Sequence, residues 1–386
     1  MMFRYTCLNP VSQVGLNCFG SGYVSTSSMD DADAVLVRSA DMHHISVPDN
    51  VKCVARAGAG VNNIPLMELA EQGIPVFNTP GANANGVKEL VFAAMLLAAR
   101  DVVGGINWAA GQVGNEQVAK DTEKEKKKFA GYELSGKKLG VIGLGAIGRL
   151  VANTAIHLGM EVYGYDPYIS VDGAWNLSKN VQHCKDVKDI YASCDYITIH
   201  VPLMDATRGM VNAEAFTLTK PTTVLINLAR DVLVDEQAAV QALAEGRLGK
   251  YVTDFPNPTV LGKKGVIAIP HLGASTEESE DNCAVAAVKQ VKDFLENGNL
   301  TNCVNFPNCQ MGICTSAGRV GVFHENTKSI ISQFTTALSH TNILNMSNVS
   351  RGTLAYTLLD LEEQIPEETI KKMETITGIY RVIVVK

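Results

Sequence analysis

The sequence of 386 residues has no excess of positive charge and no long apolar run. Its 33 Lys and Arg residues face 40 Asp and Glu residues, which gives a net charge of −7. Dedicated nucleic-acid-binding proteins neutralise phosphates with basic side chains, so this balance argues against that class. The longest strongly apolar run, Leu90–Ala99, is about half of the ~20 residues that span a bilayer. We therefore expect neither a nucleic acid nor a membrane as a partner.

The sequence also lacks the features of a secreted protein. The first residues, MMFRYTCLNPVSQ, contain no apolar stretch of the kind found in secretory signals. The nine cysteines are scattered without a Cys-x-x-Cys pair, which is typical of reduced thiols in a cytosolic protein. We expect a cytoplasmic protein without a metal site. A hydrophobic content of 46% and a charged content of 19% indicate a globular chain, whose length predicts two or three domains.

Short apolar segments alternate with longer amphipathic ones through the first three quarters of the sequence. Such alternation predicts an α/β fold with parallel sheets and right-handed crossovers. A run of charges, Lys120–Lys128, is expected to be a solvated helix end or loop. The expected helices include Val87–Arg100, Ile147–Leu158 and Glu236–Glu245, and the expected strands are Ala34–Arg38, Cys53–Arg56, Val76–Asn78, Lys138–Ile142, Glu161–Asp166, Tyr196–Val201, Val224–Asn227, Tyr251–Thr253 and Val266–Ile269.

The pattern changes near residue 310. Residues 309–317 have little periodicity and are expected to form a linker. The following segments predict the order βαββαβ, which is the ferredoxin-like plan. These segments are Val320–His324 (strand), Ser329–Ser339 (helix), Ile343–Val349 and Leu354–Leu359 (strands), Pro366–Ile376 (helix) and Arg381–Val385 (strand).

A glycine motif, Gly143-Leu-Gly145-Ala-Ile-Gly148, follows the strand at Lys138–Ile142 and opens a helix. In a dinucleotide site the first glycine allows a tight turn, the second lets the backbone approach a pyrophosphate, and the third allows close helix–strand packing. The helix N-terminus then offers unpaired N–H groups to the anion. Asp166 ends the next strand, 18 residues after Gly148. A carboxylate there accepts hydrogen bonds from the ribose hydroxyls and repels a 2′-phosphate, so we predict NAD as the cofactor, not NADP.

Two charged residues follow later strands. Arg230 comes after Val224–Asn227, and His271 comes after Val266–Ile269. Each could be a structural residue, a surface Arg or a core His. Because the carboxyl ends of strands in open α/β sheets face the ligand crevice, the pair also suits oxidation of a 2-hydroxy acid. His would accept the hydroxyl proton, and Arg would bind the carboxylate and polarise the reacting oxygen.

These residues resemble the D-isomer-specific 2-hydroxyacid dehydrogenases. The resemblance rests on Gly143–Gly148, Leu228-Ala-Arg230, Asp254 and Pro270-His271-Leu-Gly. The segments Cys53–Ile64 and Phe77–Asn83 are similar to the substrate-side loops of the family members that oxidise 3-phospho-D-glycerate. The tail from Arg319, with His324-Glu-Asn326, resembles their C-terminal ACT domain.

The resemblance implies a domain arrangement. Residues 1–99 with 278–308 are expected to form a discontinuous, Rossmann-like substrate-binding domain. Residues 100–277 are expected to form an inserted NAD-binding Rossmann domain. Residues 318–386 are expected to form a ferredoxin-like ACT domain for regulation or assembly. The family also suggests a homo-oligomer, either a dimer through the cofactor domains or a tetramer through ACT pairing.

The same resemblance implies roles for individual residues. Arg230 would bind the substrate carboxylate and reacting oxygen, His271 would be the acid/base, and Asp254 would orient the nicotinamide amide. Arg38 and Arg56 match positions near the substrate phosphate, with ordinary ion pairing as the alternative, and Gly58, Ala59 and Gly60 would present backbone N–H groups. The expected NAD-binding residues are Gly143, Gly145, Ala146, Ile147, Gly148, Asp166, Pro202, Thr207, Leu228, Ala229, Arg230 and Asp254.

One position departs from the family pattern. The family has a Glu five residues after the Asp, and that Glu hydrogen-bonds the catalytic His. This chain has Thr259 at that position and no Glu between Glu245 and Glu277. A His without a carboxylate partner loses an interaction that raises its pKa and fixes its tautomer. Asp231, adjacent to Arg230, is a candidate substitute.

The ACT-like tail carries a candidate effector site for an amino acid. His324 and Asn326 match residues that hold L-serine in related proteins, and the alternative is that they cap a turn. The following loop, Thr327-Lys328-Ser329, has no Gly, and Leu344 stands where a second Asn is expected. We therefore predict a weak response to L-serine or none.

Three functions remain open at this point. The first is NAD-dependent oxidation of 3-phospho-D-glycerate to 3-phosphohydroxypyruvate, which opens serine biosynthesis. The second is oxidation of another D-2-hydroxy acid, and the third is an NAD-sensing binding protein with the same fold. The ACT-like tail argues against the third, and a turnover assay separates all three.

Overall fold

A computed structural model describes residues 2–386, which form two compact units. Unit 1 contains the residues up to Asn83 together with Glu277–Lys386, and unit 2 is Ala84–Thr276. No helix in the described part of the chain combines the length and apolarity that crossing a bilayer requires. The predicted fold class is confirmed, because two parallel sheets and one antiparallel sheet are present.

Unit 2 is built on a seven-stranded sheet in which every paired neighbour is parallel. Its order, β12-β11-β10-β9-β6-β7-β8, is the doubly wound order with a reversal between β6 and β9, where ligands bind in such folds. The strands are β6 (Lys138–Ile142), β7 (Glu161–Tyr165), β8 (Gln182–His183), β9 (Tyr196–Ile199), β10 (Val224–Asn227), β11 (Lys250–Thr253) and β12 (Val266–Ala268).

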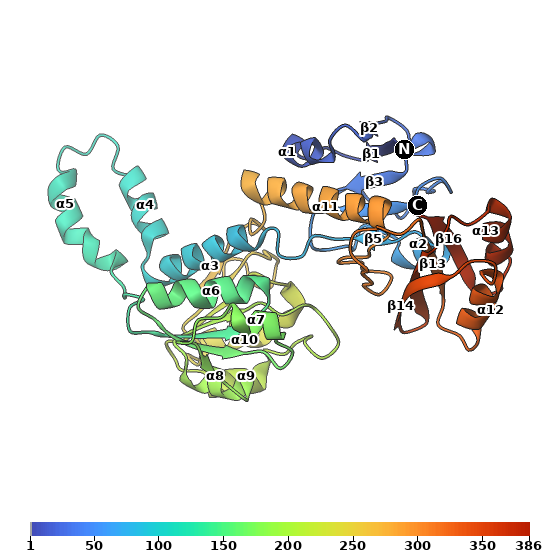
Figure 1. Ribbon diagram of the computed structural model, residues 1–386. Coiled ribbons are helices and arrows are strands. Elements are labelled where there is room, and N and C mark those ends of the chain that lie inside the picture. The colour runs from blue at the N-terminus through green and yellow to red at the C-terminus, as the bar shows by residue number, and fades with distance from the viewer. Residues whose placement is uncertain (1) are drawn as a thin grey trace. The chain divides into compact units, whose positions relative to one another are not determined.

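Helices flank this sheet, and two of them extend away from the rest of unit 2, α4 and α5 (Figure 1). The charge run at Lys120–Lys128 lies in α5 and the following 3-10 turn η3, so the expectation of a solvated segment is confirmed. The helices are α3 (Ala84–Ala99), α4 (Val102–Ala110), α5 (Val118–Glu125), η3 (Lys126–Phe129), α6 (Ala146–His157), α7 (Val171–Trp175), α8 (Val187–Ser193), α9 (Ala213–Leu218), η4 (Asp231–Leu233) and α10 (Glu236–Ala244).

Helix α3 packs in the core of unit 2. Its Val91 and Met95 belong to the same buried cluster as Val151 and Ala155 of α6. The sequence-based division placed α3 in the substrate-binding domain, but these apolar contacts group it with the glycine-motif helix. The boundary therefore falls before α3 in the structure, at Asn83.

Unit 1 begins with a parallel sheet of order β2-β1-β3-β4-β5. Helix α11 lies along this sheet (Figure 1) and buries Cys283, Ala287, Val291 and Phe294 in a core shared with the strands. The elements are β1 (Phe3–Cys7), α1 (Gln13–Leu16), η1 (Asn17–Phe19), β2 (Tyr23–Ser25), η2 (Met29–Asp31), β3 (Ala34–Val37), β4 (Cys53–Arg56), α2 (Leu66–Glu71), β5 (Val76–Phe77) and α11 (Glu277–Asn297).

The C-terminal part of unit 1 has the predicted βαββαβ order. Its antiparallel sheet, β14-β15-β13-β16, places the first strand between the third and the fourth, as in the ferredoxin-like plan. The elements are β13 (Gly318–Glu325), α12 (Ile330–Ala337), β14 (Ile343–Arg351), β15 (Leu354–Leu361), α13 (Glu367–Glu374) and β16 (Ile379–Val384).

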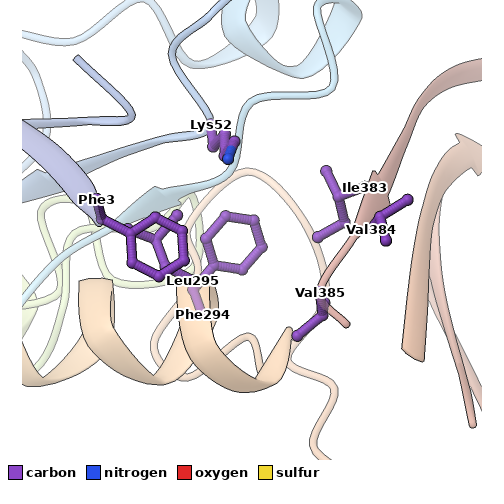
Figure 2. Close-up of a pocket in the computed structure, with 7 residues that line it drawn as sticks. All are labelled: Phe3, Lys52, Phe294, Leu295, Ile383, Val384 and Val385. Carbon is purple, nitrogen blue, oxygen red and sulfur yellow. The ribbon is translucent and has the colours of Figure 1, made fainter. Parts of the chain in front are cut away.

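The C-terminal sheet shares its core with the N-terminal part of unit 1. The Phe323 ring lies 6.3 Å from that of Phe294 in α11 and 4.5 Å from that of Tyr356, and Tyr356 donates a hydrogen bond to the Gly298 carbonyl. Figure 2 shows the edge of this junction, where a cavity of only about 20 Å³ remains among Phe3, Lys52, Phe294, Leu295, Ile383, Val384 and Val385. The packing makes the C-terminal sheet an integral part of unit 1.

Candidate active site

The glycine motif forms the turn between β6 and α6. Gly143 has a φ of +91°, a conformation that favours glycine. A Cβ atom at Gly148 would lie 1.9 Å from the Gly143 carbonyl oxygen, whereas one at Gly145 would meet no atom within 4 Å. The three glycines therefore serve three purposes: turning, leaving open space and allowing close packing.

The end of α6 at this turn is open to an anion. Gly145 is the N-cap residue, and no side chain among residues 2–386 caps the helix there. Gly145 and Ala146 are exposed, and Ile147 is half-buried. The first N–H groups of a helix lack partners within the helix and carry a partial positive charge. This end of α6 can therefore bind a phosphate group.

Asp166 lies directly after β7 and contacts the same turn. Its Oδ2 accepts a hydrogen bond of 2.8 Å from the backbone N–H of Leu144, inside the glycine motif. Its Oδ1 accepts one of 2.9 Å from the N–H of Tyr168. Because each carboxylate oxygen has more than one lone pair, the half-buried Asp166 keeps acceptor capacity for a ligand while it orders the motif.

The loop after β9 lies on the other side of the sheet reversal. The Thr207 hydroxyl donates to the Pro202 carbonyl at 2.7 Å and accepts from the Met204 N–H at 2.9 Å. Thr207 therefore holds the loop in a closed turn. Two of the predicted cofactor residues, Pro202 and Thr207, thus belong to one ordered loop at the carboxyl edge of the sheet.

His200 begins this loop and was missed by sequence reasoning. Its Nε2 lies 2.9 Å from the Thr198 hydroxyl, and burial lowers the pKa of His200 to about 3. The described residues offer no partner to its buried Nδ1. The signal was available, because His200 follows an apolar strand in the same way as His271. His200 is therefore a neutral imidazole whose Nδ1 has no hydrogen-bond partner among the described residues.

The turn that carries Arg230 is ordered by Asn227. This fully buried side chain donates to the Arg230 carbonyl at 2.8 Å and accepts from the Ala229 N–H at 3.3 Å. Leu228 is buried between them. The Arg230 side chain is exposed, and its guanidinium donates to the Ala229 carbonyl at 2.6 Å. Sequence reasoning passed over Asn227, although a buried amide at the end of an apolar strand is itself a signal.

Asp254 and His271 lie at the ends of β11 and β12, beside Arg230. Asp254 is fully buried, and neither of its carboxylate oxygens has a hydrogen-bond partner within residues 2–386. Burial raises the pKa of Asp254, while the nearby charges of His271 and Arg230 act to lower it. These three predicted residues therefore form one cluster. A buried acceptor without a partner is costly, so Asp254 is suited to a ligand that donates a hydrogen bond.

His271 packs against an aromatic ring. The imidazole lies edge-on to Phe255, with ring centroids 5.0 Å apart, and is exposed. Among the residues that the structure describes, no carboxylate hydrogen-bonds to it. Asp231 is exposed and accepts a hydrogen bond from the N–H of Val232, and Thr259 donates its N–H to Asn257. Asp254 is the carboxylate whose pKa the nearby charge of His271 acts to lower.

A second group of predicted residues lies in unit 1, around residues 58–60. The Thr79 N–H donates to the Gly58 carbonyl at 3.0 Å, and the Asn78 side chain donates to the Ala59 carbonyl at 2.6 Å. Gln290 of α11 in turn donates to the Asn78 carbonyl at 2.9 Å. This loop, with Gly60 at its end, is therefore held by the segment after β5 and by α11.

Arg38 and Arg56 lie together beside this loop. The Arg56 guanidinium donates to the Arg38 carbonyl at 3.0 Å and to the Gly60 carbonyl. The Arg38 guanidinium forms an ion pair with Glu280, at the start of α11. Arg38 therefore has an ion-pair partner within unit 1.

The candidate effector residues have partners within their own domain. The buried His324 ring contacts the Glu325 carbonyl at 2.7 Å and the Thr357 hydroxyl at 2.8 Å. Asn326 donates to the Gly352 carbonyl at 3.1 Å. Ser329 has a φ of +64°, in the left-handed region that favours glycine.

The comparisons with known proteins cover most of the chain. Residues 92–273 match the NAD binding domain of the D-isomer specific 2-hydroxyacid dehydrogenases. The D-3-phosphoglycerate dehydrogenases of Methanocaldococcus jannaschii and Homo sapiens are 38% and 35% identical to this chain over 288 residues. Each match covers 72% of this chain and 52% of the relative. The chain therefore spans about half the length of these relatives.

A solved structure is also similar. The NAD+-bound 3-phosphoglycerate dehydrogenase of Entamoeba histolytica aligns with a TM-score of 0.60 and 27% identity, covering 79% of this chain and 99% of that chain.

Proposed function

We propose that this chain, whose residues 92–273 match the NAD binding domain of the D-isomer specific 2-hydroxyacid dehydrogenases, is a member of that family and oxidises 3-phospho-D-glycerate to 3-phosphohydroxypyruvate with NAD. The observation that carries the proposal is the cluster of Arg230, Asp254 and His271 at the carboxyl ends of three neighbouring strands. The sheet that carries this cluster also carries the glycine motif at its reversal point. A cation, a buried acceptor and an imidazole on a dinucleotide-binding sheet suit the oxidation of a 2-hydroxy acid.

The residues present fit NAD. The exposed N-terminus of α6 and the open space at Gly145 suit a pyrophosphate, and Asp166 suits a ribose with free hydroxyls. The unpartnered oxygens of Asp254 suit the N–H groups of a carboxamide. When bound, NAD supplies the hydride acceptor for C2 of the substrate. Leu228, Ala229, Pro202 and Thr207 would complete the walls of this site.

The proton and the charges are handled by this chain's own residues. The His271 imidazole accepts the proton of the C2 hydroxyl, and its edge contact with Phe255 holds the ring in place. Arg230 binds the substrate carboxylate and polarises the reacting oxygen. Asn227 is a positioning residue, because its side chain bonds to the Arg230 carbonyl and to the Ala229 N–H.

Unit 1 by itself offers a candidate site for a phosphate group. Arg56 is held beside residues 58–60 by two backbone carbonyls, and Arg38 lies next to it. Two guanidinium groups and the backbone N–H groups of Ala59 and Gly60 suit a phosphate, whereas the predicted donor Gly58 already donates its N–H to the Arg56 carbonyl at 2.9 Å. The relatives named D-3-phosphoglycerate dehydrogenase support this substrate class.

The same family suggests an oligomeric state and a cellular location for this chain. A homo-oligomer is supported by α4, in which no residue is buried and Val102, Val103 and Ile106 are exposed, because exposed apolar side chains in a row mark association surfaces. A cytoplasmic location is supported by the nine free cysteines. The proposed reaction would open serine biosynthesis, and an amino-acid effector would bind at the C-terminal domain if it binds at all.

A turnover assay tests the proposal. NADH formation at 340 nm should depend on both NAD and 3-phospho-D-glycerate, and D-glycerate should be the poorer substrate. Activity with D-glycerate but not with the phosphorylated acid would favour oxidation of another 2-hydroxy acid. NAD binding without turnover of either acid would favour an NAD-sensing protein.

A further inference from the structure

Arg38, one of the two arginines on the proposed phosphate side, already has an anionic partner. Its Nη2 pairs with Oε1 of Glu280, and the two side chains are 44% and 40% exposed. Both residues belong to unit 1, so this contact lies within one unit. Before any substrate binds, a carboxylate of this chain therefore occupies the position of a ligand anion on Arg38.

Glu280 and both guanidinium groups lie near Cys283 of α11. The Arg56 guanidinium donates to the Arg38 carbonyl, and Cys283 follows Glu280 by one turn of α11. Burial raises the pKa of the Cys283 thiol, the charges of Arg56 and Arg38 act to lower it, and the charge of Glu280 acts to raise it. A phosphate bound by both arginines would therefore lie near the Glu280 carboxylate.

The local charge balance is unfavourable for a dianion. Glu277, Glu278 and Glu280 all lie in the first turn of α11, so the partial positive charge of this helix end is already compensated. A phosphate that takes over the Arg38 Nη2 hydrogen bond would displace Glu280, and the displaced carboxylate would remain tethered nearby as a like charge. Electrostatic repulsion at such short range falls on a phosphorylated acid and not on an acid that lacks the phosphate.

We infer that Glu280 is a specificity-determining residue that weakens selection of phosphorylated over unphosphorylated 2-hydroxy acids by pairing with Arg38. The inference rests on the proposed function, which places the substrate phosphate at Arg38 and Arg56. Glu280 acts through Arg38 and is a positioning residue for it. Its carboxylate sets how much of the Arg38 charge is available to a substrate.

The variant Glu280→Gln tests this role, because it keeps the side-chain shape and removes the charge. We expect the KM for 3-phospho-D-glycerate to fall about threefold to tenfold relative to the KM for D-glycerate, with the main effect in KM and not in kcat. Glu278→Gln is the matched control, since it removes one charge from the same helix turn, and we expect a change of less than about twofold. A rise in the KM for the phosphorylated acid, or equal shifts for both acids, would overturn the inference.

A binding measurement separates this inference from the proposed function. Calorimetric titration of the full chain with inorganic phosphate should give tighter binding for Glu280→Gln than for the unmodified protein, and weaker binding for Arg38→Ala. If the unmodified protein fails to oxidise 3-phospho-D-glycerate, the proposed function fails, and the phosphate titration still decides the role of Glu280. Equal phosphate affinity in Glu280→Gln and the unmodified protein would overturn the role even if turnover is intact.

Discussion

Two histidine-containing regions of this molecule use their polar groups in opposite ways. At the carboxyl edge of the unit 2 sheet, His200 Nδ1 and both oxygens of Asp254 are buried without partners in the described chain. In the C-terminal sheet, the His324 ring contacts the Glu325 carbonyl and the Thr357 hydroxyl, and that hydroxyl also lies 2.7 Å from the Asn348 side chain. The first region has unused hydrogen-bonding capacity, and the second has satisfied its own.

This difference separates a site that is built for a ligand from one that is built for the fold. A buried polar atom without a partner costs free energy, so it persists where a ligand is to supply the missing bond. A satisfied network contributes to stability and has little left to offer a ligand. Asp254 and His324 matched family site residues equally well in sequence, and only their surroundings distinguish them.

The largest expected effects come from replacing the two proposed catalytic residues of unit 2. Arg230→Ala and His271→Ala should each lower kcat/KM by at least about 100-fold, because in the proposed reaction each removes a group that contacts the reacting oxygen or its proton. Both side chains are exposed, so the midpoint of thermal unfolding should change little. Steady-state kinetics with NAD and 3-phospho-D-glycerate measures the loss.

Matched controls lie elsewhere in unit 2. Arg247 pairs with Glu245 on the surface, and His157 ends α6 at the end away from the glycine motif. Arg247→Ala and His157→Ala should keep kcat/KM within about twofold. Near-normal turnover in Arg230→Ala or His271→Ala would remove that residue from the mechanism.

Cofactor choice is the next largest effect. Asp166→Ala should weaken NAD binding about tenfold, since it removes the ribose acceptor and also the bond to the Leu144 N–H. Asp166→Asn keeps an oxygen for Leu144 and removes only the charge. Both variants should discriminate less against NADP, and the Ala variant should lose more NAD affinity. Fluorescence titration with NADH and NADPH measures both. Equal use of NADP and NAD by the unmodified protein would contradict the assignment.

Much of the candidate site in unit 2 could be predicted because its residues lie close together in the sequence or directly follow expected strands. Gly143, Gly145 and Gly148 lie within six consecutive residues, and the alternation of strands and helices predicted that Arg230 and His271 each follow a strand, which in the structure are β10 and β12. The sheet order itself, with β9 beside β6, depends on long-range packing and was not available. Asn227 and His200 were missed because both fell within expected strands, Val224–Asn227 and Tyr196–Val201, and were not considered as site residues.

Unit 1 was predicted less completely, for a different physical reason. The ion pair between Arg38 and Glu280 joins residues 242 positions apart, and nothing in the spacing of either residue predicts it. The contact of Phe323 with Phe294 likewise depends on how the C-terminal sheet packs against α11. Bonds within a motif can be inferred from sequence, whereas bonds between distant segments require the fold.

Two substitutions, one in each region, should change the free energy of unfolding in opposite directions. His324→Leu removes satisfied hydrogen bonds and should lower the free energy of unfolding by about 1–3 kcal/mol. Asp254→Asn removes a buried, unpartnered charge and should raise it. Chemical denaturation in the absence of NAD measures both. A stabilising His324→Leu or a destabilising Asp254→Asn would contradict the contrast between unused hydrogen-bonding capacity at Asp254 and a satisfied network at His324.

The pH dependence of each effect follows from its pKa. Burial lowers the pKa of His324 below its usual 6.5, so its contribution to stability is present above pH 6.5 and is lost as the pH falls. Burial raises the pKa of Asp254 above its usual 3.8, so its cost is absent below that value and grows as the pH rises through the native pKa. The difference in the free energy of unfolding between His324→Leu and the unmodified protein should therefore become smaller below pH 6.5. The increase in the free energy of unfolding caused by Asp254→Asn should become larger above pH 3.8.

The smallest expected effect is the response to L-serine. Both nitrogens of His324 are engaged within the domain, Asn326 donates to Gly352, and the exposed Leu344 lies at an irregularity of β14. An effector would have to compete with these intramolecular bonds, and a leucyl side chain offers it no polar contact. Millimolar L-serine should therefore change the initial rate by less than about twofold and leave the unfolding midpoint unmoved. Half-inhibition at micromolar L-serine would mean that the network around His324 opens for a ligand, and His324→Leu would then abolish the inhibition while leaving the Arg230 and His271 chemistry in place.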